Sequence, residues 1–90
     1  MLFMVIEHFG SGGGATEVYE RHRTTRRQLP EGLTYIDSWV SADLERCFQL
    51  MECDDAEKLQ AWAAQWTDLV AFEFVPVTSS TAARELFNAT

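Results

Sequence analysis

The order of strand-like and helix-like segments constrains the fold of this chain more than any other feature of its sequence. Four short runs are rich in aromatic and β-branched residues, as strands are, and they lie at residues 2–9, 33–40, 46–53 and 70–77. Two segments of helical periodicity separate them, at residues 15–28 and 54–69. In the second, the apolar residues recur at the spacing of one helix face and are Leu59, Trp62, Ala63, Trp66 and Leu69. Asp54 is predicted to cap this helix, with Glu57 completing a capping box.

The resulting order, β-α-β-β-α-β, predicts a ferredoxin-like α+β fold. In this fold a four-stranded antiparallel sheet carries two helices on one face. A short C-terminal helix is expected to follow, with a cap among residues 79–81 and an end near Phe87. Ninety residues leave room for one hydrophobic core, so residues 1–90 are predicted to form a single domain. The second face of the sheet must then meet water, a ligand or another chain.

The net charge of the chain is strongly negative. Fourteen acidic residues against seven basic ones give −7 at pH 7, and this charge opposes binding to nucleic acid or anionic lipid. We therefore predict no nucleic-acid partner and no membrane partner. Four of the seven basic residues lie close together, at Arg21, Arg23, Arg26 and Arg27. We interpret this run as a solvated helix face, with a local anion site or a contact for an acidic partner as the alternative.

Two cysteines, Cys47 and Cys53, lie in the same predicted strand. They lie six residues apart, or roughly 20 Å along a strand, which is too far for a disulfide. Free buried thiols are expected, which fits a reducing cytoplasm. The apolar N-terminal run stops at Glu7 and has neither a basic lead nor a cleavage site, so we predict no signal peptide and no membrane span. The cysteine and histidine spacings predict no metal site, and we expect no cofactor.

Residues 10–15 (GSGGGA) match the G-x-G-x-x-A pattern of dinucleotide-binding loops. Such a site requires a parallel sheet, whereas residues 33–53 have the pattern of a hairpin. We therefore predict a flexible connection here, with a mobile lid over a cavity as the alternative.

Several stretches of the chain resemble a known protein family. They are MLFMVIE at 1–7, LPEGL at 29–33, DSWV at 37–40, RCFQLME at 46–52 and FEFVPV at 72–77. Over nearly the whole chain, these stretches are similar to the bacterial domain-of-unknown-function family 3303. The resemblance implies a homodimer in which two such sheets face each other, a dimeric α+β barrel. It implies no function, because other dimeric α+β barrels include cofactor-independent monooxygenases, haem-degrading enzymes, lactone isomerases and stress proteins.

Side-chain alternation along the strands gives the candidate site residues. We assign the more apolar set of each strand to the helix-covered face, so the set with polar members faces away from the helices. Six residues of that open face form the candidate ligand-binding cavity: Glu7, Tyr35, Asp37, Trp39, Gln49 and Glu73. Carboxylates enclosed there would have raised pKa values, as acid–base catalysts require. The competing interpretation is a wet dimer interface in which these groups pair with Arg or Tyr.

Two hypotheses about function follow. The favoured one is a structural or interaction protein, a homodimer whose open sheet faces bury each other. The alternative is a small-molecule binding protein or cofactor-independent enzyme that uses a cavity between the two sheets. Structural roles are expected for His8 and His22, so no catalytic residue is assigned and the sequence does not decide whether the protein is an enzyme.

Overall fold

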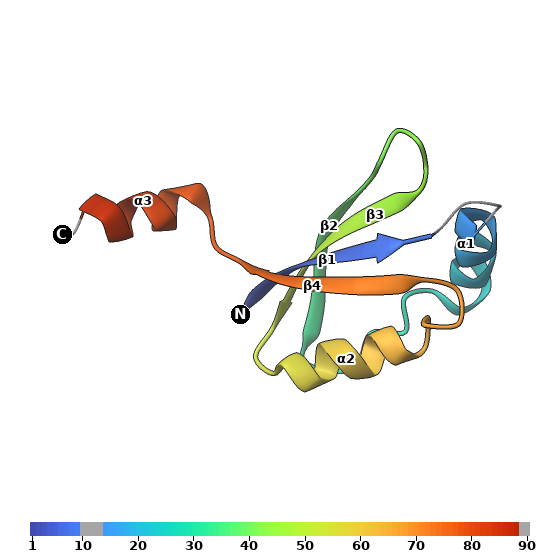
Figure 1. Cartoon of the computed structure of the whole chain (residues 1–90). Coiled ribbons are helices and arrows are strands. Elements are labelled where there is room, and N and C mark those ends of the chain that lie inside the picture. Colours follow the sequence, from blue (N-terminus) through green and yellow to red (C-terminus); the bar gives the residue numbers. More distant parts are fainter. Residues whose placement is uncertain (10–13, 89–90) are drawn as a thin grey trace.

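The computed structural model describes residues 1–9 and 14–88. Seven elements follow one another in these residues: β1 (Leu2–His8), α1 (Gly14–Thr25), β2 (Leu33–Val40), β3 (Arg46–Cys53), α2 (Ala56–Ala64), β4 (Ala71–Val77) and α3 (Ser80–Asn88). The strands form one antiparallel sheet in the order β2-β3-β1-β4 (Figure 1). This is the ferredoxin-like α+β fold that the sequence predicts. No helix among the described residues combines the length and the apolar character needed to cross a bilayer.

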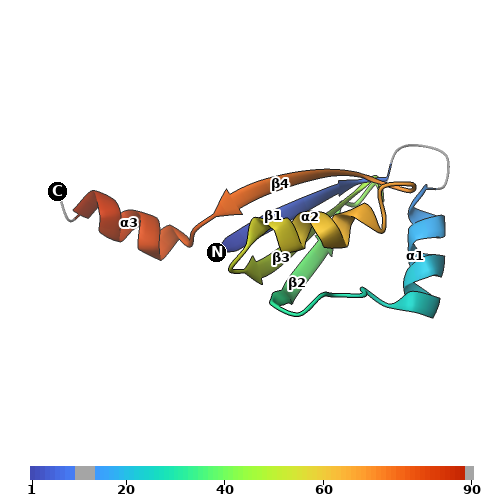
Figure 2. The same cartoon turned by 90° about the horizontal axis from the view of Figure 1, so that it is seen from below.

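The three helices occupy different places around the sheet. Figure 2 shows α2 lying across one face, α1 standing at one end and α3 projecting from the opposite end. Gly14 starts α1 so close to β1 that a Cβ atom there would overlap the carbonyl oxygen of Phe9. This position therefore requires glycine. The rest of the glycine-rich connection, residues 10–13, lies outside the described residues, so its predicted role is not tested.

Two helix boundaries differ from the sequence-based expectation. α1 ends at Thr25 rather than near residue 28, because Arg26 and Gln28 have left-handed φ angles of 59° and 54°, which a helix cannot continue. Asp55, rather than Asp54, caps α2. The Oδ1 atom of Asp55 accepts a hydrogen bond of 2.9 Å from the backbone N–H of Glu57. Glu57 therefore sits one position too early for the predicted capping box.

The core lies between α2 and the sheet. α2 contributes Leu59, Trp62 and Ala63, as its periodicity predicts, and Trp66 follows just after its end. The Trp62 ring meets Phe72 of β4 edge-on, with ring centroids 5.7 Å apart. Cys47 and Cys53 are free and buried on β3, which confirms the prediction that they do not pair.

The predicted face of two strands is wrong. Phe3, Val5 and Glu7 of β1 lie beneath the helices, each at most 5% exposed. On β3 the helix-facing set is likewise the one assigned to the open face: Cys47, Gln49, Met51 and Cys53. The reason is that both alternating sets of β1 and β3 are largely apolar, so composition does not say which set faces the helices. On β4, Phe72 and Phe74 pack against the core as predicted.

A bulge divides the two ends of β2. The pairing with β3 shifts between Tyr35 and Asp37, which leaves Ile36 as the extra residue. Tyr35 consequently packs against the core and Ser38 lies opposite Gln49, on the same side of the sheet. Asp37 and Trp39 keep the predicted open face, opposite Leu50 and Phe48.

Candidate functional site

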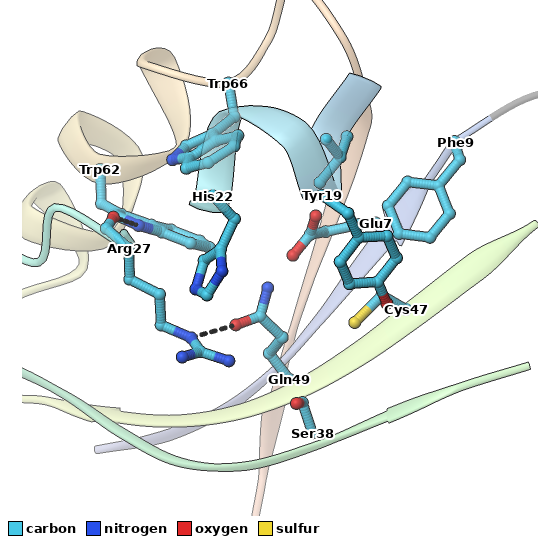
Figure 3. Close-up of a pocket in the computed structure, with 11 residues that line it drawn as sticks. Glu7, Phe9, Tyr19, His22, Arg27, Ser38, Cys47, Gln49, Trp62 and Trp66 are labelled. Carbon is cyan, nitrogen blue, oxygen red and sulfur yellow. Dashed lines mark hydrogen bonds between the residues drawn. The ribbon is translucent and has the colours of Figure 1, made fainter. Parts of the chain in front are cut away.

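A pocket lies between α1, the end of α2 and the helix-covered face of β1 and β3 (Figure 3). Its lining residues are Glu7, Phe9, Val18, Tyr19, His22, Arg27, Ser38, Cys47, Gln49, Trp62 and Trp66. The pocket offers about 80 Å³ to the centres of water-sized atoms. That is room for roughly five to eight water molecules, or for an organic molecule with one small ring.

Glu7 is the most unusual group in this pocket. It pairs with Cys47 and Phe72 in the sheet, and its side chain is 4% exposed. Its Oε1 atom is buried and has no hydrogen-bond partner among the described residues. Burial raises the pKa of Glu7 from 4.5 to about 7, and the positive charge of Arg27 opposes this rise. Near neutral pH, Glu7 therefore exists in both its protonated and its ionised form.

The imidazole, thiol and phenol groups of the pocket all have pKa values shifted toward their neutral forms. Burial and the neighbouring arginines, Arg27 and Arg26, lower the pKa of His22. Burial, and then the charge of Glu7, raises the pKa of the Cys47 thiol to about 11. Burial also raises the pKa of Tyr19. The site thus offers proton donors and acceptors around Glu7 but no thiolate nucleophile.

Arg21 fixes the position of α1 over the pocket. Its guanidinium binds Asp68 through two hydrogen bonds, one of 2.7 Å from Nη1, and also donates to the carbonyl oxygen of Gln65. It lies 5.6 Å from the centroid of the Trp66 ring. These contacts tie α1 to the segment after α2 and so hold Tyr19 and His22 of α1 at the pocket (Figure 3).

A known protein family matches this chain over its whole length. The family model for the domain of unknown function DUF3303 matches residues 1–90. The chain belongs to this family. No curated protein and no solved structure matches the chain. DUF3303 membership agrees with the resemblance seen in the strands and assigns no reaction to the pocket.

The six residues predicted to form one cavity are divided between the two faces of this DUF3303 domain. Glu7 and Gln49 line the pocket, and Tyr35 lies half-buried beside it, with its hydroxyl 2.6 Å from Ser38 Oγ. The other three are exposed on the opposite face: Asp37, Trp39 and Glu73. Glu73 Oε1 lies there 3.5 Å from Nε2 of His8.

Within residues 1–9 and 14–88, the pocket therefore holds a single carboxylate rather than the several enclosed carboxylates that the sequence predicts. Among the described residues that line it, Glu7 is the one carboxylate, so burial rather than repulsion between carboxylates raises its pKa. No group of three or more His, Cys, Asp or Glu residues in the described part of the chain could hold a metal ion. The chemistry available here is binding and proton exchange by side chains.

Sequence reasoning missed several pocket residues of the DUF3303 chain. It placed Trp62 and Trp66 in the core but did not foresee that they also wall a cavity. The signals for His22 and Arg27 were weak: both lie in the segment predicted as the first helix, and Arg27 belongs to the arginine run. A backbone reversal after α1 brings Arg27 back to the sheet, and no local pattern predicts that reversal.

Proposed function

We propose that this protein binds a small molecule in the pocket under α1, and that Glu7 exchanges a proton or a hydrogen bond with it. The observation that carries the proposal is the buried Oε1 atom of Glu7, which lines a cavity and has no partner among the described residues. A buried carboxyl group without a hydrogen bond costs free energy, so a protein keeps one where a ligand or water completes it.

The shape and walls of the pocket favour a flat, largely apolar ligand. The side chains of Phe9, Tyr19, Trp62 and Trp66 supply aromatic surface around Glu7. A carboxyl group with a pKa near 7 suits general acid–base chemistry at neutral pH, because it can both give and take a proton there. This supports a binding protein or a cofactor-independent enzyme whose site lies inside one chain, rather than between two sheets.

The three tryptophans allow a direct test. Trp62 and Trp66 line the pocket, whereas Trp39 lies on the opposite face of the sheet. In a ¹⁵N NMR titration with phenol, benzamide and benzoate, we expect at least one compound to shift the indole signals of Trp62 and Trp66. The Trp39 signal should stay unchanged. Shifts at none of the tryptophans, or first at Trp39, would overturn the proposal.

We also propose that a second copy of the chain covers the open face of the sheet. Ile36 and Trp39 on β2 are 49% and 51% exposed, which leaves apolar surface uncovered on that side. The same face carries both signs of charge, with Arg46 packed over Phe48 and the carboxylates Asp37 and Glu73 nearby in the sheet. A two-fold axis could pair these opposite charges between copies.

The free, buried cysteines support a reducing compartment such as the cytoplasm.

A further inference from the structure

Arg27 is held in the pocket wall from three directions. Its guanidinium lies 3.6 Å from the centroid of the Tyr35 ring, and its Nε donates a long hydrogen bond of 3.5 Å to Gln49 Oε1. Its carbonyl oxygen accepts a hydrogen bond of 2.8 Å from Trp62 Nε1 (Figure 3). Packing against two aromatic side chains and an amide fixes both the backbone and the head group, so the position of the charge is preorganised.

The backbone around Arg27 is strained. Arg26 and Gln28 on either side both have left-handed φ angles, which residues other than glycine adopt rarely. Such strain persists only where surrounding contacts enforce it, and it concentrates at binding and catalytic sites. The chain thus accepts an unfavourable path in order to place the Arg27 side chain at the pocket.

Arg27 has no anionic partner within the described part of the chain. The ion pairs found there join Met1 to Glu52, His8 to Glu73 and Arg21 to Asp68. Glu7 lines the same pocket but forms no ion pair with Arg27. A half-buried guanidinium that lines an aromatic cavity and pairs with no carboxylate of the described residues has donors to spare for a bound anion.

We propose that the ligand of this pocket is a small organic anion, a carboxylate on a flat unsaturated body, with its carboxylate on Arg27 and its far end at Glu7. The inference rests on the function proposed above and adds the substrate class. A guanidinium fork matches a planar carboxylate through two parallel hydrogen bonds. The aromatic walls take the flat body, and the pocket volume of about 80 Å³ suits a small molecule.

The charge distribution supports entry of an anion at this point. The whole chain carries −7, yet four of its seven basic residues lie in one run at the C-terminal half of α1 and just beyond it. Arg23 and Arg26 of this run are exposed beside the pocket-lining residues His22 and Arg27. They provide a local positive potential that offsets repulsion from the rest of the surface.

Benzoate and benzamide separate this inference from the function on which it depends, because they share ring and size and differ in charge. In the same tryptophan titration, we expect benzoate to bind roughly tenfold more tightly than benzamide, as a charge-assisted hydrogen bond provides. Arg27→Gln should remove that preference, so that this variant binds the two probes with similar affinity. The matched control is Arg23→Gln, which removes the same charge from an exposed site and should keep the preference.

Each other outcome decides between the two proposals. Equal binding of both probes to the unaltered protein would overturn the anion class and leave the pocket standing, whereas no binding of either would overturn both. Equal losses in Arg27→Gln and Arg23→Gln would show that general surface charge attracts benzoate, against the role given to Arg27. If Arg27→Gln fails to fold, Arg27→Lys replaces it. Lysine keeps the charge without the fork, so undiminished benzoate binding by this variant would contradict the bidentate contact.

Discussion

At the scale of single residues, Glu7 determines how the protein responds to pH. Its pKa is 4.5 in an exposed chain and about 7 in the folded protein. The folded state therefore holds this proton more tightly than the unfolded state, and stability decreases as the pH rises from about 4.5 to about 7. The loss amounts to about 3 kcal/mol, since each pKa unit corresponds to about 1.4 kcal/mol.

Replacing Glu7 by Gln should remove this loss. We expect Glu7→Gln to be more stable than the natural chain by about 3 kcal/mol at about pH 8, with the difference shrinking toward about pH 4.5. Urea unfolding at several pH values measures this. The control is Glu31→Gln, which removes an exposed carboxylate and should leave the curve unchanged. A Glu7→Gln variant that is less stable at about pH 8 would contradict the buried, unpartnered state of Glu7.

Glu7 and Gln49 also mark the limit of sequence-based prediction in this protein. A rule that turns polar residues away from the core assigns both to the open face, yet both are buried, at 4% and 7% exposure. The rule fails at these residues because they line a pocket, where a ligand or water can meet their hydrogen-bonding needs. Asp37 and Glu73, which line no pocket described here, are exposed where the same rule places them.

At the scale of elements, the periodicity of α2 was informative and the alternation along β1 and β3 was not. A helix with a polar and an apolar side has one way to face the core, so Leu59, Trp62 and Ala63 were predicted correctly. On β1 the competing sets, Phe3 with Val5 and Met4 with Ile6, are equally apolar. The choice between them depends on packing against α2, which no local pattern contains.

Trp62 should account for much of the stability that α2 adds to the folded protein. This residue is 2% exposed, packs edge-on against Phe72 and donates a hydrogen bond to the backbone of Arg27. Trp62→Ala should lower the free energy of unfolding by roughly 3–5 kcal/mol through the cavity it leaves. Gln60→Ala, on the exposed side of the same helix, is the control and should change it by less than about 0.5 kcal/mol. A loss below about 1 kcal/mol for Trp62→Ala in denaturant titration would mean that α2 packs elsewhere.

At the scale of the whole molecule, the two faces of the sheet have different partners. One face is covered by α2 and closed at one end by α1, whereas no helix of the described residues covers the other (Figure 2). α3 also has no buried residue, and its Leu86 is 70% exposed. A helix of nine residues is marginal in water without packing, so α3 is a second surface that association would stabilise.

The dimer proposal yields a test that leaves the pocket untouched. Trp39 is 51% exposed on the open face of the edge strand β2 and lies on the far side of the sheet from Glu7. Light scattering at micromolar concentration should give twice the 10.3 kDa chain mass for the natural protein and the chain mass for Trp39→Glu. Gln60→Glu adds the same charge on the exposed side of α2, so it should remain dimeric. Because each copy carries −7, the measurement is repeated at several salt concentrations, since salt screens repulsion between copies. A natural protein that stays at the chain mass at every salt concentration would leave the open face to another partner.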